Sequence, residues 1–178
     1  NLVVSSSSNV VLKIDPSVVL ATRAYVDQKV LDELNKQDFK FSVYVATTAP
    51  IALNGLPAID GESIAEGARV LVKNQALPKE NGIYVAGAGV WVRAQDADIS
   101  IEVTPGLLVH VERGTALGDS IWQLVTNTPI VLGTTDLVFE MAAGRTGVAV
   151  GTYTSVTVDK YGRVIAATSP TTLGGFGI

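Results

Sequence analysis

The stretch FKFSVYVA, residues 39–46, decides the fold class because its apolar residues alternate with others along the chain. Phe39, Phe41, Val43 and Val45 are separated by Lys40, Ser42 and Tyr44, and Ala46 follows the last of them. This alternation is typical of a strand with one buried face. The sequence therefore predicts that a β domain begins here, with the two phenylalanines and the two valines facing its core.

Further strand signals follow at intervals of roughly ten to fifteen residues, with glycine, proline, asparagine or aspartate between them. They cover residues 69–73, apolar on both faces, and then 82–86, 90–93, 107–112, 120–125 and 137–141. Residues 87–89 (Gly-Ala-Gly) are expected to be the turn of a hairpin, and residues 59–62 a tight turn. The spacing predicts a mainly β fold, with an antiparallel β sandwich or small barrel forming a knob over residues 38–145.

Upstream of the knob, residues 22–37 predict a helix. Thr22 suits the N-cap, and the segment contains neither glycine nor proline. Val26, Val30 and Leu34 recur every four residues, and Leu31 widens this apolar stripe. A helix of about 15 residues is roughly 22 Å long and is marginal in water when isolated. We expect it either to lie on the β domain or to bundle with copies of itself.

The two ends of the chain read as appendages of the knob. Residues 1–21, with a serine run at 5–8, are expected to form an extended shaft segment. Residues 146–178 predict a β hairpin, with strands 151–158 and 163–168 around the turn at 159–162, and then a Gly-rich exit towards a missing distal tip. A two-stranded hairpin is as marginal alone as the helix is.

Because the helix and the hairpin both need a partner surface, association about a common axis is the simplest expectation. The predicted assembly is a parallel homotrimer or dimer. In the trimer, the axis would be lined by the helical residues Val26, Val30, Leu31 and Leu34. The composition agrees, since 47% hydrophobic residues and a mean hydropathy of +0.35 are difficult for a soluble monomer to bury.

The composition also excludes several classes of function. The 178 residues include no cysteine and one histidine, so disulfides, thiolate metal sites and histidine-rich metal sites are excluded. A net charge of −4 argues against a nucleic-acid groove, which needs clustered positive charge. No apolar run reaches the length of a membrane span, so no membrane insertion is expected. The absence of a starting methionine suggests a fragment of a longer protein.

Asp96, Asp98 and Glu102 are weak candidates for a metal site. They place oxygen ligands at alternate positions as a Ca²⁺ loop begins, but the mid-loop glycine and the late bidentate glutamate are missing. The favoured alternative is a solvated loop that pairs with Arg93. No cofactor is expected.

His110 shares a predicted strand face with Leu108 and Glu112. No nucleophile motif accompanies it, so exposure on an outer sheet face is favoured over a catalytic role. In a parallel trimer, three copies meeting at the axis would be a remote alternative that binds a metal. No catalytic residue is assigned, and the chain is not expected to be an enzyme.

The aromatic residues most able to stack on a sugar are Tyr44, Tyr84, Trp91 and Trp122. The two tryptophans sit within apolar strands and are expected in the core. Tyr44 and Tyr84 remain possible glycan contacts, since Tyr84 alternates with Ile83 and Val85 and so is expected to be exposed.

Three segments resemble those of a known class of proteins. Residues 20–27 (LATRAYVD) resemble a helix entry of bacteriophage tail fibres. Residues 59–98, with GARVLVKNQ at 67–75, NGIYV at 81–85 and WVRAQDAD at 91–98, resemble a β module of phage tail proteins. Residues 151–164 (GTYTSVTVDKYGRV) and 172–178 (TLGGFGI) are similar to the link before fibre tips. The same modules occur in tail fibres of phage-tail-like R-type bacteriocins.

This resemblance implies a parallel homotrimeric fibre with a coiled-coil helix, a β knob and a wound hairpin. It implies a virion (or bacteriocin) particle part made in the host cytoplasm and used outside the cell. Its partners would be its own copies, other tail or baseplate proteins, and a bacterial surface glycan such as lipopolysaccharide or capsule. The main hypothesis is a structural fibre segment that positions a receptor-binding tip for host attachment. The alternatives, in order, are a carbohydrate-binding module and a polysaccharide depolymerase.

Overall fold

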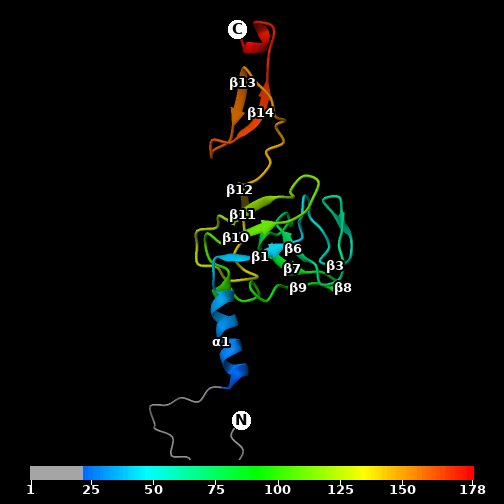
Figure 1. The fold of residues 1–178 in the computed structure, drawn as a ribbon, viewed down its shortest axis with the longest axis vertical. Helices are drawn as coiled ribbons and strands as arrows, with labels where there is room; N and C mark the ends of the chain where they lie inside the picture. The colour runs from blue at the N-terminus through cyan, green and yellow to red at the C-terminus, as the bar shows by residue number, and fades with distance from the viewer. Residues whose placement is uncertain (1–21) are drawn as a thin grey trace, which may run out of the picture. The chain divides into compact units, whose positions relative to one another are not determined.

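The structure, a computed structural model, describes residues 22–178 (Figure 1). This part of the chain is mainly β, with several small sheets and one α-helix, as expected. The predicted shaft at 1–21 lies outside the described residues. The chain divides into two compact units between Glu33 and Leu34, so the knob and the hairpin belong to the same unit.

Helix α1 spans Arg23–Asn35, which confirms the predicted helix to within two residues at each end. It begins where predicted because the Thr22 hydroxyl accepts a hydrogen bond from the main-chain N–H of Tyr25 at 3.1 Å. At its other end the buried Asn35 donates its side-chain amide to the carbonyl of Gln95 at 3.3 Å. The main-chain oxygen of Asn35 accepts a hydrogen bond from Lys40 Nζ at 2.5 Å, which satisfies a carbonyl in the last helical turn.

The strands form two four-stranded sheets and three two-stranded ribbons within residues 22–178. The first sheet has the order β1-β10-β11-β12, and the second has the order β2-β6-β7-β9. Their bounds are β1 Phe39–Val43, β10 Leu108–Val111, β11 Ser120–Leu124, β12 Phe139–Ala143, β2 Val45–Ala46, β6 Arg69–Val72, β7 Gly82–Val85 and β9 Val92–Arg93. The stretch 39–46 therefore supplies one strand to each sheet.

This shared stretch makes both sheets mixed, which corrects the antiparallel prediction. β1 runs parallel to β10, and β2 runs parallel to β6. Tyr44, which lies between β1 and β2, is hydrogen-bonded to both sheets. Its N–H donates to Arg69 O at 2.8 Å, and its carbonyl oxygen accepts from Arg113 N at 2.8 Å. The partner strands β6 and β10 lie far along the chain from β2 and β1. Long connections can therefore return them parallel to these strands, whereas a short hairpin joins only antiparallel strands.

The predicted inward face of this stretch is wrong at its start. Phe39 and Phe41 are exposed, whereas Lys40 is buried. A register irregularity between Lys40 and Val43 shifts the alternation, so that Val43 and Val45 do face the core as expected. A bulge of this kind changes which face a side chain takes.

The two-stranded ribbons pair β3 Asn54–Gly55 with β8 Gly87–Val90, β4 Ala58–Ile59 with β5 Glu62–Ser63, and β13 Ser155–Val158 with β14 Val164–Thr168. The first pair corrects the predicted turn at 87–89, which is instead a strand. The second and third confirm the tight turn at 59–62 and the C-terminal hairpin. Gly162, at φ +78°, donates its N–H to Asp159 O at 3.0 Å and closes the hairpin turn. Short 3₁₀ turns are η1 Pro78–Glu80, η2 Ser100–Glu102 and η3 Gly174–Phe176.

Two apolar clusters stabilise the knob, one on each side of the second sheet. The larger contains Val43, Ala46, Leu71, Ile83, Ala94, Ala97, Val103, Leu107, Val109, Val111, Trp122, Leu124, Ile130, Leu137 and Phe139. The smaller contains Val45, Ile59, Ile64, Val70, Val72, Tyr84, Ala86 and Trp91. Strand β6 contributes to both clusters, which confirms that it is apolar on both faces. Trp91 and Trp122 lie in the core as predicted.

Candidate functional site

The predicted metal loop carries a buried salt bridge. Asp96 Oδ2 accepts a hydrogen bond from Arg69 Nη2 at 2.9 Å and another from the main-chain N–H of Phe41 at 3.2 Å. The expected pairing with Arg93 is wrong, because Arg93 donates to the main-chain oxygens of Asn81 and Lys79. The loop is thus partly buried by its contact with β1 and β6 rather than solvated.

The other two metal candidates do not join Asp96 in a ligand cluster. Asp98 is exposed, and Glu102 is buried with its Oε2 accepting the main-chain N–H of Asp98 at 3.3 Å. Burial raises the pKa of Glu102, against the lowering effect of these main-chain hydrogen bonds. Residues 22–178 contain no group of three His, Asp or Glu side chains placed to hold a metal ion.

Lys40 is a buried cation that the alternation pattern misses. Its Nζ binds the end of α1 through Asn35 O, and burial lowers its pKa while Asp96, Glu102 and Asp38 raise it. A cation at a helix C-terminus is stabilised by the partial negative charge there. Lys40 therefore has a structural role, and no reactive group is brought to it.

Tyr84, predicted as an exposed glycan contact, is buried at 6% exposure, so that prediction is wrong. Its hydroxyl donates to Glu80 O at 2.7 Å, and the Arg93 guanidinium lies 4.9 Å from its ring centre. Burial raises the pKa of Tyr84, and the nearby Arg93 opposes this. The ring belongs to the smaller core cluster and presents no free face to a sugar.

Tyr44 remains a candidate for glycan contact. It is half-buried, its hydroxyl lies 3.3 Å from Glu62 Oε2, and the Arg113 guanidinium is 5.6 Å from its ring centre. It lines an open depression of about 430 Å³ together with Ser63, Ala65, Glu66, Gly67 and Ala68.

His110 is exposed on the outer face of the first sheet, as predicted. Its ring centre lies 6.1 Å from that of Phe39. Directly after this strand, Glu112 accepts a hydrogen bond from the Ser42 hydroxyl at 2.5 Å. Ser42 is thereby bound to Glu112 instead of His110, and no nucleophile–base pair is assembled here.

Lys73 is a second unusual lysine; it is half-buried and directly follows β6. Its Nζ lies 4.1 Å from the centre of the Trp122 ring and donates to Asn74 Oδ1 at 3.0 Å. Burial lowers its pKa to about 8, with Asp60 opposing the shift. The sequence carried no signal for this contact, because Lys73 follows β6 and Trp122 lies on β11, far along the chain.

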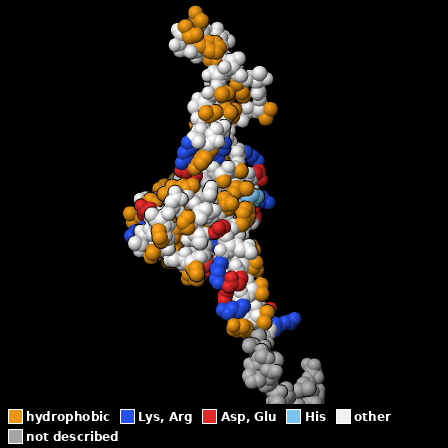
Figure 2. All heavy atoms as spheres, turned by 90° about the vertical axis from the view of Figure 1, so that its left-hand side faces the viewer, with side chains coloured by type: hydrophobic (Ala, Val, Ile, Leu, Met, Phe, Trp, Pro, Cys, Tyr) orange, Lys and Arg blue, Asp and Glu red, His pale blue; other side chains and the backbone are white. Residues whose placement is uncertain are grey.

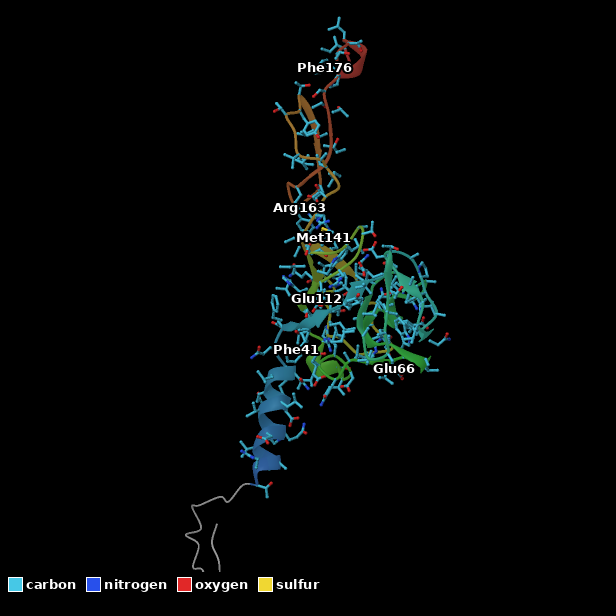
Figure 3. All side chains as sticks on the ribbon, turned by 45° about the vertical axis from the view of Figure 1, so that its right-hand side comes forward. Phe41, Glu66, Glu112, Met141, Arg163 and Phe176 are labelled. Atoms are coloured by element: carbon cyan, nitrogen blue, oxygen red, sulfur yellow. The ribbon has the colours of Figure 1, made fainter. Side chains whose placement is uncertain are left out.

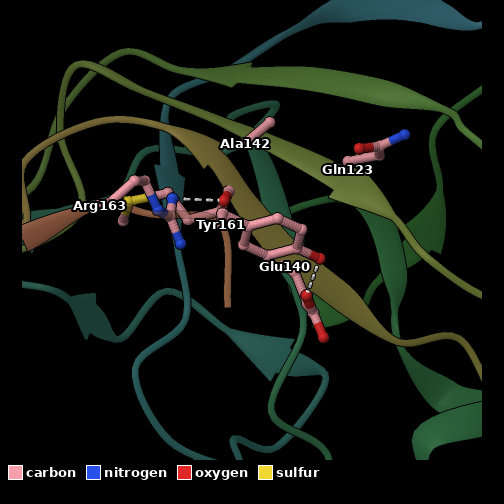
Figure 4. Close-up of a pocket in the computed structure, with 6 residues that line it drawn as sticks. Gln123, Glu140, Ala142, Tyr161 and Arg163 are labelled. Carbon is pink, nitrogen blue, oxygen red and sulfur yellow. Dashed lines mark hydrogen bonds between the residues drawn. The ribbon is translucent and has the colours of Figure 1, made fainter. Parts of the chain in front are cut away.

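The C-terminal hairpin is tied to the knob by a cluster that the sequence did not reveal. Tyr161, in the hairpin turn, donates its hydroxyl to the carboxylate of Glu140 on β12 (Figure 4). The neighbouring Lys160 Nζ donates to Glu140 Oε1 at 2.7 Å. Arg163 Nη1 donates to the main-chain oxygen of Met141 at 2.5 Å. We call Glu140, Lys160, Tyr161 and Arg163 the hairpin clamp.

The clamp borders two adjoining depressions that share Gln123, Glu140 and Tyr161. One, of about 210 Å³, also includes Arg163, and the other, of about 600 Å³, includes Asn127 and Lys160. The Tyr161 ring is 54% exposed. Amide, carboxylate and aromatic groups of this kind can bind hydroxyl-rich ligands. The Tyr161 ring is also in contact with two cations, since Lys160 Nζ and the Arg163 guanidinium lie 5.0 Å and 5.4 Å from its centre.

Large apolar side chains are exposed on α1 and on the C-terminal hairpin (Figure 2). On α1, Val26, Val30 and Leu34 are 47%, 55% and 44% exposed, while Leu31 is half-buried. On the hairpin, Val156 and Val158 are both more than half exposed. Their cross-strand partners Ala167 and Val164 are half-buried, so one face of the hairpin is apolar and partly exposed in the described chain.

No family model, curated protein or solved structure matches the chain. Within residues 22–178, no helix has the length and apolar character needed to cross a membrane.

Proposed function

We propose that this chain is a structural segment of a tail fibre, from a bacteriophage or a phage-tail-like bacteriocin, that associates with copies of itself. In this role it positions a receptor-binding tip for attachment to the host cell. Its partners would be its own copies, other tail or baseplate proteins and, through the tip, a bacterial surface glycan. It would act outside the cell as part of the particle.

The observation that supports self-association is the exposed stripe of Val26, Val30 and Leu34 on α1. A helix of this length is marginal when isolated in water, and an apolar stripe is typically buried against a partner. A parallel trimer with these residues and Leu31 at its axis would bury the stripe. The partly exposed apolar face of the hairpin, with Val156 and Val158, has the same requirement.

The test is the mass of the chain in solution, measured by sedimentation equilibrium. A trimer is expected for the unmodified chain, and Val30→Asp is expected to dissociate it by placing three carboxylates in the seam. Gln28→Asp makes the same change of charge about 200° away on the helix and is expected to leave the trimer intact. A monomer at every concentration would overturn the proposal.

A second candidate function is direct binding of bacterial polysaccharide by the knob. The exposed Tyr161 ring beside Gln123 and Asn127 favours it, and so does the half-buried Tyr44 above its depression. A glycan array would be probed with the unmodified chain and with Tyr161→Ala and Tyr44→Ala. Binding that is lost in one of these variants would locate the contact, and no binding by the unmodified chain would exclude this function for the panel tested.

A further inference from the structure

The outer face of the first sheet is apolar and partly exposed where β1 meets β10, whereas Gln123 and Glu140 make it polar next to the hairpin. We call Phe39, Phe41, Leu108, His110 and Ile121 the outer aromatic patch. Phe39 and Phe41 are 55% and 59% exposed, and Leu108 and Ile121 are half-buried. The register places these side chains together, since Phe39 pairs with Leu108 and His110 pairs with Ile121. Two largely exposed phenylalanines on one face are unusual for a surface that remains in water.

We propose that the outer aromatic patch is the contact between knobs of neighbouring copies of this chain. This inference rests on the proposed self-association and adds the face of the knob that takes part in it. It also explains why the strand that opens the knob alternates apolar residues from Phe39 onward, although its first two phenylalanines point away from the core of their own chain.

Chain connectivity favours a second copy as the occupant. β1 begins at Phe39, a few residues after α1 ends at Asn35, and β12 leads from Ala143 towards the hairpin. β1 and β12 are the two outermost strands of the first sheet. The sheet that carries the patch is therefore the one that the chain enters from the helix and leaves towards the hairpin. These are the two elements proposed to associate with their copies.

The apolar stripe on α1 is too small to form a stable interface between copies by itself. Stable interfaces between proteins bury about 800 Å² on each partner. A single stripe on α1, which has 13 residues and is about 20 Å long, is short for that purpose. The outer aromatic patch would add large apolar side chains to the same assembly.

Charge is compatible with contact between identical faces. The chain carries a net charge of −4, and a contact patch without acidic side chains adds no further repulsion between copies. Within the patch, His110 is the only titratable side chain. The adjacent Glu112 (Figure 3) lies outside the patch and accepts a hydrogen bond from the Ser42 hydroxyl.

The absence of cysteine allows a direct test in the full chain. His110→Cys places a single thiol in the patch, and Glu66→Cys places one on an exposed loop that lies on the other side of the knob from Phe41 (Figure 3). Spin labels on the trimer are expected to give a shorter and narrower distance distribution at 110 than at 66. Mild oxidation is expected to cross-link copies through Cys at 110 and not at 66.

A second variant measures the energetic contribution. Phe41→Glu is expected to weaken association at least about tenfold, because burying a phenylalanine contributes roughly 1.5–3 kcal/mol. Val90→Glu, at a side chain 82% exposed on β8, is the matched control and is expected to change nothing. Circular dichroism of both variants checks that the knob remains folded.

The outcomes separate the two proposals. A trimer in which labels at 110 are no closer than labels at 66, or in which Phe41→Glu has no effect, overturns the patch contact and leaves the fibre proposal standing. This includes the case in which a different protein covers the patch. A monomer overturns both proposals.

Discussion

Lys160, in the turn of the C-terminal hairpin, donates a hydrogen bond to Glu140 of β12 over 2.7 Å. Twenty residues of sequence separate the two side chains, and the contact joins a two-stranded ribbon to the edge strand of the knob. Since both faces of the hairpin are otherwise largely exposed, this pair and its neighbours Tyr161 and Arg163 determine whether the hairpin is held to the knob.

Replacing Glu140 by glutamine is therefore expected to release the hairpin without unfolding the knob. The melting temperature should change little, because exposed ion pairs contribute about 0–1 kcal/mol. Amide hydrogen exchange of residues 155–168 is expected to accelerate, while exchange in β6 and β10 stays slow. Glu66→Gln removes the same charge from an exposed loop and should alter neither. Unchanged exchange in the hairpin of Glu140→Gln would show that the Glu140 carboxylate is not what holds it, since the Arg163 hydrogen bond to Met141 O remains in this variant.

The clamp is also expected to weaken in acid. Hydrogen bonds from Lys160 and then Tyr161 hold the pKa of Glu140 below its usual value of 4.5. A carboxylate with a lowered pKa in the folded state stabilises that state above its unfolded pKa, and this contribution is lost as the pH falls through the folded pKa. A carbon-13 NMR titration of the Glu140 carboxyl group measures the shift. Lys160→Met should raise this pKa more than Tyr161→Phe does, and the reverse order would contradict the assignment of the main partner.

Lys73 is expected to titrate with a pKa of about 8, because burial disfavours its charged form more than Asp60 favours it. Between that value and the usual 10.5 the unfolded chain binds more protons at this residue than the folded chain, so its contribution to stability rises with pH. Unfolding free energies of the unmodified chain and of Lys73→Met are measured by urea denaturation. Between pH 8 and 10.5, the unfolding free energy of the unmodified chain should rise relative to that of the variant. A constant difference over that range would disprove the lowered pKa.

The buried pair of Asp96 and Arg69 is expected to stabilise the knob. Asp96→Ala should cost about 1–3 kcal/mol, because it leaves the Phe41 N–H without its acceptor and removes the carboxylate partner of Arg69, whose guanidinium keeps its hydrogen bonds to Ser42 O and Phe41 O. The neighbouring exposed Asp98→Ala should change stability by less than about 0.5 kcal/mol. Urea denaturation measures both. Repeating the series with added Ca²⁺ tests the metal alternative, since a large stabilisation that disappears in either variant would restore the loop as a cation site.

Gly82 is expected to resist substitution. It has φ +146°, and a Cβ at this position would lie 2.1 Å from Arg93 Nη1, which donates to Asn81 O. Gly82→Ala should destabilise the fold by about 1–3 kcal/mol through backbone strain. Gly87→Ala, where the backbone is ordinary and a Cβ meets open space, is the control and should stay within about 0.5 kcal/mol. Equal melting temperatures for the two variants would contradict this account.

Local patterns were sufficient to predict the elements of the fold. The helix after Thr22, the turn at 59–62, the two-faced strand β6 and the hairpin around Gly162 all lie where the sequence placed them. Each depends on interactions within about ten residues, such as a cap, a left-handed glycine or a hydrophobic period. The burial of Trp91 and Trp122 followed from strands that are apolar on both sides of them.

Properties that depend on long-range pairing were not predictable in this way. Alternation shows that a strand has two faces but does not say which one is buried, and the irregularity after Lys40 reversed the expected assignment for Phe39 and Phe41. Tyr84 is buried because a second core forms on the far side of its sheet. The salt bridge of Asp96 goes to Arg69, 27 residues away, instead of to the nearby Arg93.

For residues 22–178, the sequence by itself thus predicted a mainly β fold with one helix, a C-terminal hairpin and a high content of apolar residues. Only the tertiary structure decided where apolar side chains remain exposed: on the stripe of α1, on one face of the hairpin and on the outer face of the first sheet. The physical reason is that a hydrophobic period is set by residues close together in the chain. Which face of a sheet is exposed depends instead on how strands distant in the sequence pair and pack.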